Sequence, residues 1–157
     1  MEQAKRTTRQ VRIGGVIVGG GAPIAVQSMC ATRTVAIDET VAQTHQLASA
    51  GAAIVRIALD SDKEVAALKE IRQQTRGINL SVDLQENYRI ANKVAPYVDK
   101  IRYNPGHLHH IEKSKTIEQK VRWLADVARD NNVAIRIGVN CGSVARGRAS
   151  KFSALAI

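Results

Sequence analysis

The sequence predicts an α/β protein that forms a partial (β/α) barrel of the TIM type, with about five βα units after an N-terminal β-hairpin. Two observations predict this fold class. Short apolar segments alternate along the chain with helical segments, a pattern typical of parallel βαβ units with right-handed crossovers. Charged side chains also recur on one face of several apolar segments. The polar mouth of a barrel accommodates them better than a sheet that helices cover on both faces.

The N-terminal segment RQVRIGGVIVGGGAP, residues 9–23, predicts the β-hairpin. Two short apolar runs flank Gly14 and Gly15, and a second group of glycines followed by Pro23 ends the unit, as expected for tight turns. A phosphate-binding loop is the alternative for these glycines. No helical segment follows them, and their spacing differs from that of a dinucleotide-binding motif. We therefore interpret them as turn residues.

Five later segments predict the parallel strands. Each is short, rich in aliphatic residues and bounded by polar or turn-forming residues. They are IAVQSM at 24–29, AAIVRIAL at 52–59, NLSVDL at 79–84, DKIRYN at 99–104 and VAIRIGVN at 133–140.

Four segments between them predict helices, at residues 38–50, 62–74, 87–95 and 116–131. The first begins with Asp38 as its N-cap and ends before Gly51, and the third stops at Pro96, since these residue types mark helix ends. In the fourth, residues at helical spacing predict one buried stripe, which comprises Ile117, Val121, Leu124 and Val127. Trp123 lies near this stripe, and core packing explains it.

The charged residues of the predicted strands share one face. Because side chains alternate along a strand, Arg102 and Asn104 lie opposite Ile101 and Tyr103. The apolar face packs against the helices, so the polar face lines the barrel interior near the carboxyl ends of the strands, where barrel active sites open. The candidate site residues are Arg56, Asp83, Arg102, Asn104, Arg136 and Asn140.

Arg136 interrupts an apolar strand, where an unpaired charge is costly. We expect it to face a polar cavity together with Arg56 and Arg102, with space left beside it by Gly138. Guanidinium groups bind oxygens bidentately, so three of them suit a polyanionic ligand such as a diphosphate. Asp83 would hold one arginine in place or accept a hydrogen bond from a hydroxyl. The alternative is that the arginines end edge strands and reach solvent.

Histidines and cysteines are the other candidates. Of His107, His109 and His110, only the first two would face the same way in an extended loop, and no fourth ligand has useful spacing. We interpret this segment as a solvated loop rather than a metal site. The two cysteines, Cys30 and Cys141, lack a CxxC partner and predict neither a disulfide framework nor a closed metal site. Cys141 also lacks a recognisable histidine and carboxylate partner, so we interpret it as a small, half-buried residue.

The composition argues against a general nucleic-acid surface. The formal net charge is +9, but residues 1–12 carry four bases and one acid, and residues 145–157 carry three bases and no acid. Aromatic residues, which stack on bases, make up only 3% of the chain. No apolar run is long enough to span a bilayer, and the polar start lacks the apolar segment of a secretory signal. We expect a cytoplasmic protein with no membrane partner.

Three segments, GGGAPIAVQSM, KIRYNPG and IRIGVNCGS, with VDLQENYRIANKVA between them, resemble the N-terminal barrel of 4-hydroxy-3-methylbut-2-enyl diphosphate synthases. The resemblance runs from about Val11 to Val144. It implies the reductive ring opening of 2-C-methyl-D-erythritol 2,4-cyclodiphosphate in the methylerythritol phosphate route to isoprenoids. It also implies a homodimer, an electron donor that is ferredoxin or flavodoxin, and a [4Fe-4S] cluster in a separate carboxy-terminal domain.

The resemblance implies roles for individual residues. The family's diphosphate-binding arginines and asparagines fall on Arg56, Arg102, Asn104, Arg136 and Asn140, with an acidic position at Asp83. Two positions depart from the family pattern. Gln85 stands where many members have histidine, and Cys30 stands where many have threonine. We expect no catalytic or metal-ligating residue of the family within this chain.

The domain assignment follows from the same motifs. We assign residues 1–144 to the N-terminal part of the substrate-binding barrel and residues 145–157 to a tail unlike the family. Five strands cannot close an eight-stranded barrel, and two cysteines without partners cannot hold a [4Fe-4S] cluster, so we expect a truncated member that is inactive by itself. Two alternatives remain: another barrel enzyme for phosphorylated or pterin substrates, and a binding module whose basic ends contact nucleic acid.

Overall fold

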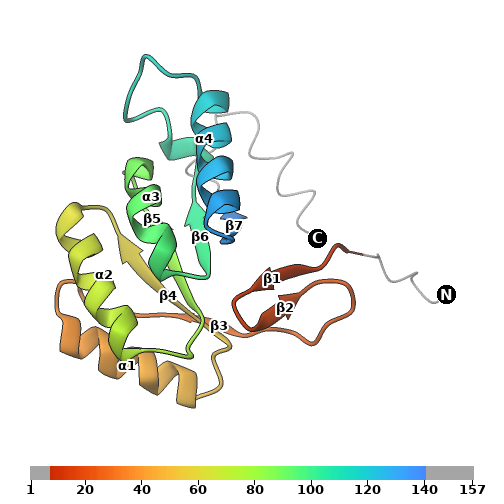
Figure 1. The fold of residues 1–157 in the computed structure, drawn as a ribbon, viewed down its shortest axis with the longest axis vertical. Coiled ribbons are helices and arrows are strands. Elements are labelled where there is room, and N and C mark those ends of the chain that lie inside the picture. The colour runs from red at the N-terminus through yellow and green to blue at the C-terminus, as the bar shows by residue number, and fades with distance from the viewer. Residues whose placement is uncertain (1–7, 141–157) are drawn as a thin grey trace.

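The computed structural model describes residues 8–140 and places two β-sheets in them (Figure 1). The first is an antiparallel hairpin of β1 (Val11–Ile13) and β2 (Val16–Val18), turned at Gly14 and Gly15 as predicted. The second is a parallel sheet of β3 (Gln27–Met29), β4 (Ile54–Leu59), β5 (Leu80–Leu84), β6 (Lys100–Tyr103) and β7 (Ala134–Ile137).

The strands of the parallel sheet are neighbours in the order in which they occur in the chain, from β3 to β7. A doubly wound sheet reverses its order at a switch point, whereas a barrel wall adds each strand beside the preceding one. All four strand pairings are parallel. The structure therefore confirms a partial barrel that follows an N-terminal hairpin.

The hairpin is anchored to the sheet through its turn. Gly15 N donates a hydrogen bond to Asn79 Oδ1 over 2.9 Å. Gly14 has a φ of +56°, and a Cβ there would lie 2.2 Å from the same Asn79 oxygen. Only glycine combines this backbone conformation with so close an approach. The hairpin thus lies at the end of the sheet where the strands begin (Figure 1).

Four helices alternate with the strands of the parallel sheet within residues 8–140. They are α1 (Ile37–Ser49), α2 (Asp62–Gln74), the short α3 (Ala91–Val94) and α4 (Ile117–Asp130). The range predicted for α2 is confirmed in full. Its N-terminus has a capping box in which Glu64 Oε2 accepts hydrogen bonds from the backbone N–H of Ser61, a device that satisfies otherwise unpaired donors.

Two helix predictions are wrong in detail. The N-cap of α1 is Ala36, and Asp38 lies within the first turn, where a carboxylate is favoured by the helix dipole instead of by capping. The continuous helix predicted over 87–95 is α3 flanked by the 3₁₀ turns η1 (Tyr88–Ile90) and η2 (Ala95–Tyr97). Asn87 Oδ1 accepts a hydrogen bond from Arg89 N, which favours a tight turn at the start of this segment.

Helix α4 buries a lysine that the predicted stripe did not contain. Ile117, expected in the stripe, is 46% exposed, whereas Lys120 is 1% exposed and Leu124 is buried beside it. The Lys120 ammonium donates hydrogen bonds to the carbonyl oxygens of Leu108 and Ile111. A buried charge is tolerated when such acceptors surround it, and these bonds attach α4 to the segment that follows β6.

The core lies between one face of the sheet and the helices. Alternate residues of β4, β5 and β6 point toward the helices and are buried; they include Val55, Ile57, Val82, Ile101 and Tyr103. Trp123 lies outside this core, contrary to the prediction, since it is 36% exposed and contacts the Tyr88 ring edge to face at 5.7 Å. Within residues 8–140, no helix is both long and apolar enough to cross a membrane.

Candidate functional site

The side of the sheet that faces away from the helices, here called the inner face, carries the predicted charged residues. The strand register pairs Met29 with Arg56 and Arg56 with Ser81, and it pairs Asp83 with Arg102. Arg102 in turn pairs with Arg136 of β7. Because paired residues of neighbouring strands point to the same side, the predicted Arg56, Asp83, Arg102 and Arg136 share the inner face.

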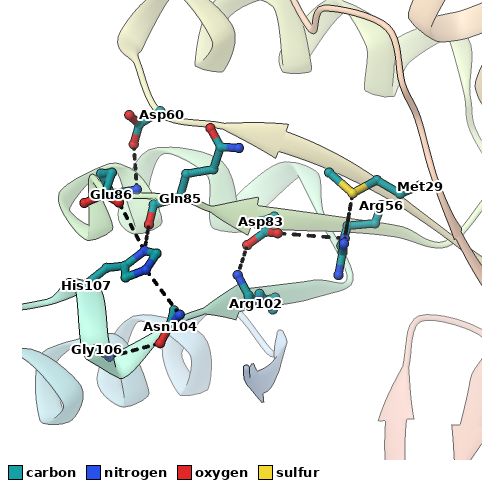
Figure 2. Close-up of polar contacts among 10 residues, drawn as sticks. All are labelled: Met29, Arg56, Asp60, Asp83, Gln85, Glu86, Arg102, Asn104, Gly106 and His107. Atoms are coloured by element: carbon teal, nitrogen blue, oxygen red, sulfur yellow. Dashed lines mark hydrogen bonds and ion pairs between the residues drawn. The ribbon is translucent and has the colours of Figure 1, made fainter. Parts of the chain in front are cut away.

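Asp83 is the centre of an ion-pair network on this face (Figure 2). Its Oδ1 lies 2.8 Å from Arg102 Nη1, and its Oδ2 lies 3.9 Å from Arg56 Nε. The three side chains are only 10 to 25% exposed, so the network lies in an environment of reduced solvent screening. One carboxylate thus holds two guanidinium groups in defined orientations.

Arg56 is also held by a sulfur atom. Its Nε and Nη2 lie 3.2 and 2.9 Å from the thioether Sδ of Met29 on the neighbouring strand (Figure 2). A thioether is a weak acceptor, and its contact occupies the side of the guanidinium that faces β3. Met29 therefore helps to fix Arg56 without neutralising its charge.

Gly138 provides space for Arg102, a neighbour that the sequence analysis did not name beside the expected Arg136. A Cβ at position 138 would lie 2.2 Å from Arg102 Nε and 2.7 Å from Arg102 Cζ. The backbone of Gly138 is held in place because its N–H donates a hydrogen bond to Tyr103 O. Arg102 belongs to the neighbouring strand β6, so the sequence of β7 alone does not show that it contacts Gly138.

Arg136 makes no ion pair with Asp83, and Asn140 follows β7. Both are exposed. Arg136 lines a cavity of about 300 Å³ between the hairpin and the inner face, which Gln27 and Lys100 also line. Gln27 and Lys100 begin their strands, so this cavity lies toward the amino ends, whereas the sequence suggested the carboxyl-end mouth.

Lys100 belongs to the same inner face and was missed by the sequence analysis. Its side chain is 5% exposed, and its Nζ donates a hydrogen bond to Gln27 Oε1. Burial, then the positive charges of Arg136 and Arg56, lower the pKa of Lys100 to about 8. The alternation in DKIRYN places Lys100 on the same face as Arg102, and that signal was sufficient to find it.

Asn104 follows β6 at the carboxyl end and is buried. Its Oδ1 accepts a hydrogen bond from Gly106 N over 3.0 Å, and its Nδ2 lies 3.3 Å from His107 Nε2. His107 and His110 both contact the carboxylate of Glu86. The structure thus brings Asn104 together with His107, and His107 together with His110.

The described residues do not fit an iron–sulfur cluster. Within residues 8–140, no group of three or more histidine, cysteine or carboxylate side chains is placed to hold a metal ion. Cys30 is buried, and its Sγ lies 3.5 Å from Thr44 Oγ1. Burial raises the pKa of the thiol although the Thr44 contact lowers it, and the raised pKa disfavours the thiolate that a cluster requires. Cys141 and the predicted tail over 145–157 lie outside the described residues.

Comparison with known proteins identifies the family. A model of the GcpE TIM-barrel domain matches residues 8–156. This range includes residues 145–156, which the sequence analysis assigned to a tail unlike the family. The 4-hydroxy-3-methylbut-2-en-1-yl diphosphate synthase (flavodoxin) of Rhodopirellula baltica is 57% identical over 97% of the chain and 40% of its own length. The synthase of the same name from Marinomonas sp. is 44% identical over 94% of the chain and 38% of its length.

The chain therefore spans about 40% of the length of the curated relatives that it matches. The match to the domain model covers more than half of the chain, and it agrees with the sequential parallel sheet and with the motifs in the strands. The chain belongs to the GcpE TIM-barrel domain family.

Proposed function

We propose that this chain forms the substrate-binding wall of a 4-hydroxy-3-methylbut-2-enyl diphosphate synthase. The proposed ligand is 2-C-methyl-D-erythritol 2,4-cyclodiphosphate, which the whole enzyme opens and reduces with two electrons. The names of the relatives support the activity and indicate flavodoxin as the electron donor. A homodimer and a cytoplasmic location are proposed for the whole enzyme on the strength of the family resemblance.

The observation that carries this proposal is the excess of positive charge on the inner face. Among residues 8–140, four cationic side chains lie there with one carboxylate, that of Asp83. These four, here called the cationic cluster, are Arg56, Lys100, Arg102 and Arg136. Like charges in a partly buried site repel one another, and the pKa of Lys100 is lowered by its burial and then by the charges of Arg136 and Arg56. A diphosphate placed over the inner face would supply the compensating negative charge.

The proposed roles follow from the contacts. Asp83 fixes Arg56 and Arg102 before the ligand arrives, so less conformational entropy is lost when their remaining N–H groups bind phosphate oxygens. Arg136 and Asn140 lie on or beyond the last described strand and would contact the ligand from that side. Asn104 would contribute an amide N–H from the end of β6.

No redox step is assigned to the described residues, because they do not fit an iron–sulfur cluster. We propose that the [4Fe-4S] cluster of the family supplies electrons in the whole enzyme. The function proposed for this chain is limited to binding, orienting and neutralising the diphosphate.

Calorimetric titration of the 157-residue chain with the cyclodiphosphate tests the binding role. We expect saturable binding, and a loss of about tenfold in affinity for Arg102→Met, the effect of one charge-assisted hydrogen bond. The control Arg122→Met makes the same change of charge on exposed α4, where Arg122 contacts only the exposed Glu118 among the described residues. Equal losses in both variants would refute a specific site.

The alternative functions make different predictions for the same titration. A nucleic-acid module would bind oligonucleotides with an affinity that falls steeply with salt. Arg102→Met would leave that affinity unchanged. A barrel enzyme for other phosphorylated or pterin substrates would bind one of those compounds more tightly than the cyclodiphosphate. Either result would overturn the proposal.

A further inference from the structure

The ring of His107 joins the ends of two strands of the partial barrel. It belongs to the 3₁₀ turn η3 (Pro105–His107), which directly follows the end of β6. Its Nδ1 lies 2.9 Å from the carbonyl oxygen of Gln85 and 3.2 Å from Glu86 Oε1, beyond the end of β5. Its Nε2 lies 3.3 Å from Asn104 Nδ2 (Figure 2).

These contacts determine where the imidazole carries its hydrogen. A carbonyl oxygen only accepts hydrogen bonds, so the Nδ1 beside Gln85 O must donate. The amide nitrogen of Asn104 only donates, so Nε2 must accept. His107 is therefore the neutral Nδ1–H tautomer, with its lone pair directed at Asn104.

The orientation of the Asn104 amide is determined from both sides. Gly106 N–H donates to Oδ1 over 3.0 Å, and His107 Nε2 accepts from Nδ2. If the amide rotated by half a turn, its NH₂ group would meet the Gly106 N–H and its oxygen would meet the lone pair of His107. Both contacts would be repulsive.

The loop against which His107 rests is itself anchored to β4. Asp60, directly after β4, accepts a hydrogen bond from Glu86 N over 2.9 Å (Figure 2). It also accepts one from Asn87 N over 2.8 Å. The carboxylate of Glu86 also contacts His110, whose ring stacks on that of His107. Support for His107 thus comes from the ends of β4 and β5 as well as from its own loop.

We propose that His107 is a positioning residue, which holds the Asn104 amide so that the second hydrogen of its NH₂ group is presented to a phosphate oxygen of the bound ligand. An amide nitrogen has two hydrogens, and His107 accepts one of them. Without His107 the amide gains the freedom to present its oxygen, which repels phosphate. The role in binding rests on the function proposed above, whereas the orientation of the amide does not.

Two substitutions at position 107 test the roles of Nε2 and Nδ1 separately. His107→Gln places an amide oxygen near the position of Nε2 and keeps an acceptor for Asn104. His107→Asn places an amide group near the position of Nδ1 and leaves Asn104 without that acceptor. His109→Asn is the matched control, since among the described residues His109 makes only a ring contact with His110.

Nitrogen NMR of the full 157-residue chain provides the first test. The unsubstituted chain should show His107 with Nδ1 protonated and Nε2 bare. The side-chain NH₂ resonances of Asn104 should stay sharp and single in His107→Gln and in His109→Asn, and should broaden or double in His107→Asn; loss of the imidazole ring shifts them in both His107 variants. A protonated Nε2 in the unsubstituted chain, or equally sharp and single Asn104 resonances in both His107 variants, would overturn the proposal.

Titration with inorganic pyrophosphate provides the second test. We expect affinity within about twofold of the unsubstituted chain for His107→Gln and for the control, and about fivefold to tenfold weaker binding for His107→Asn, the effect of one misplaced hydrogen bond. Equal affinities of the two His107 variants would overturn the role in binding. If the unsubstituted chain bound neither pyrophosphate nor the cyclodiphosphate, the proposed function would fail, while the Asn104 resonances would still decide the positioning role.

Discussion

Gly138 lies directly against the guanidinium of Arg102, so close that a Cβ at position 138 would be 2.2 Å from Arg102 Nε. Arg102 in turn lies 2.8 Å from Asp83. Because Gly138, just after β7, has no side chain, Arg102 of β6 can form its ion pair with Asp83 of β5.

Gly138→Ala should displace Arg102 from Asp83. The methyl group cannot fit unless the guanidinium moves, and overpacking of this kind lowers the free energy of unfolding by about 1–3 kcal/mol. Affinity for the cyclodiphosphate should fall as well. Chemical denaturation and calorimetry measure the two effects. The control is Gly15→Ala, where the nearest atom to a Cβ is 3.8 Å away; if it were as harmful as Gly138→Ala, the proposed clash would not be the cause.

Asp83→Asn should leave the cationic cluster without its carboxylate. Because Asp83 is 7% exposed and contacts both Arg56 and Arg102, we expect the free energy of unfolding to fall by about 2–3 kcal/mol. Pyrophosphate should then raise the unfolding temperature more in the variant than in the unsubstituted chain, since the anion replaces the lost charge. Glu118→Gln, which breaks an exposed pair with Arg122, should change stability by less than about 1 kcal/mol. An equal response of Asp83→Asn and the unsubstituted chain to pyrophosphate would contradict the proposed anion site.

Lys100→Met should stabilise the chain in a pH-dependent manner. Burial and the neighbouring arginines lower the pKa of Lys100 to about 8 from its ordinary 10.5, so between these values the unfolded chain binds more protons than the folded chain. The charged lysine therefore destabilises the fold fully below about pH 8, and this penalty fades as the pH rises toward 10.5.

We expect the methionine variant to be more stable at pH 7 by on the order of 2 kcal/mol, with the difference shrinking between pH 8 and pH 10. Denaturant titrations of both proteins at each pH measure it, and comparison with the unsubstituted chain cancels the effects of other groups. Lys100→Leu, which also removes the ammonium, should give the same pH dependence. A difference that did not change with pH would show that Lys100 is not responsible.

Anaerobic reconstitution of the 157-residue chain with iron and sulfide should leave it colourless. The chain has two cysteines, one of them the buried Cys30, and a [4Fe-4S] cluster requires more thiolate ligands than that. The visible absorption spectrum measures cluster formation, and an assay with reduced flavodoxin measures turnover. A stable brown protein that converts the cyclodiphosphate would show that this chain is sufficient for catalysis.

The arrangement of strands and helices was predictable because it depends on local patterns. Apolar segments, the helix-ending Gly51 and the alternation of Arg102 with Tyr103 all lie within a few residues of the elements that they define. The same alternation predicts that Arg56, Asp83, Arg102 and Arg136 share one face, as the strand register shows. A side-chain period of two requires no knowledge of tertiary contacts.

Which of these residues contact one another was decided only by the tertiary structure. Lys100 donates to Gln27 across 73 residues of sequence, and Gly138 makes room for Arg102 on a neighbouring strand. The burial of Lys120 depends on carbonyl groups of the loop that folds over it. The tautomer of His107 is determined by Gln85 and Asn104, whose positions depend on how β5 and β6 end side by side. Periodicity predicts the face on which a side chain lies, but strand register and loop path determine its partner.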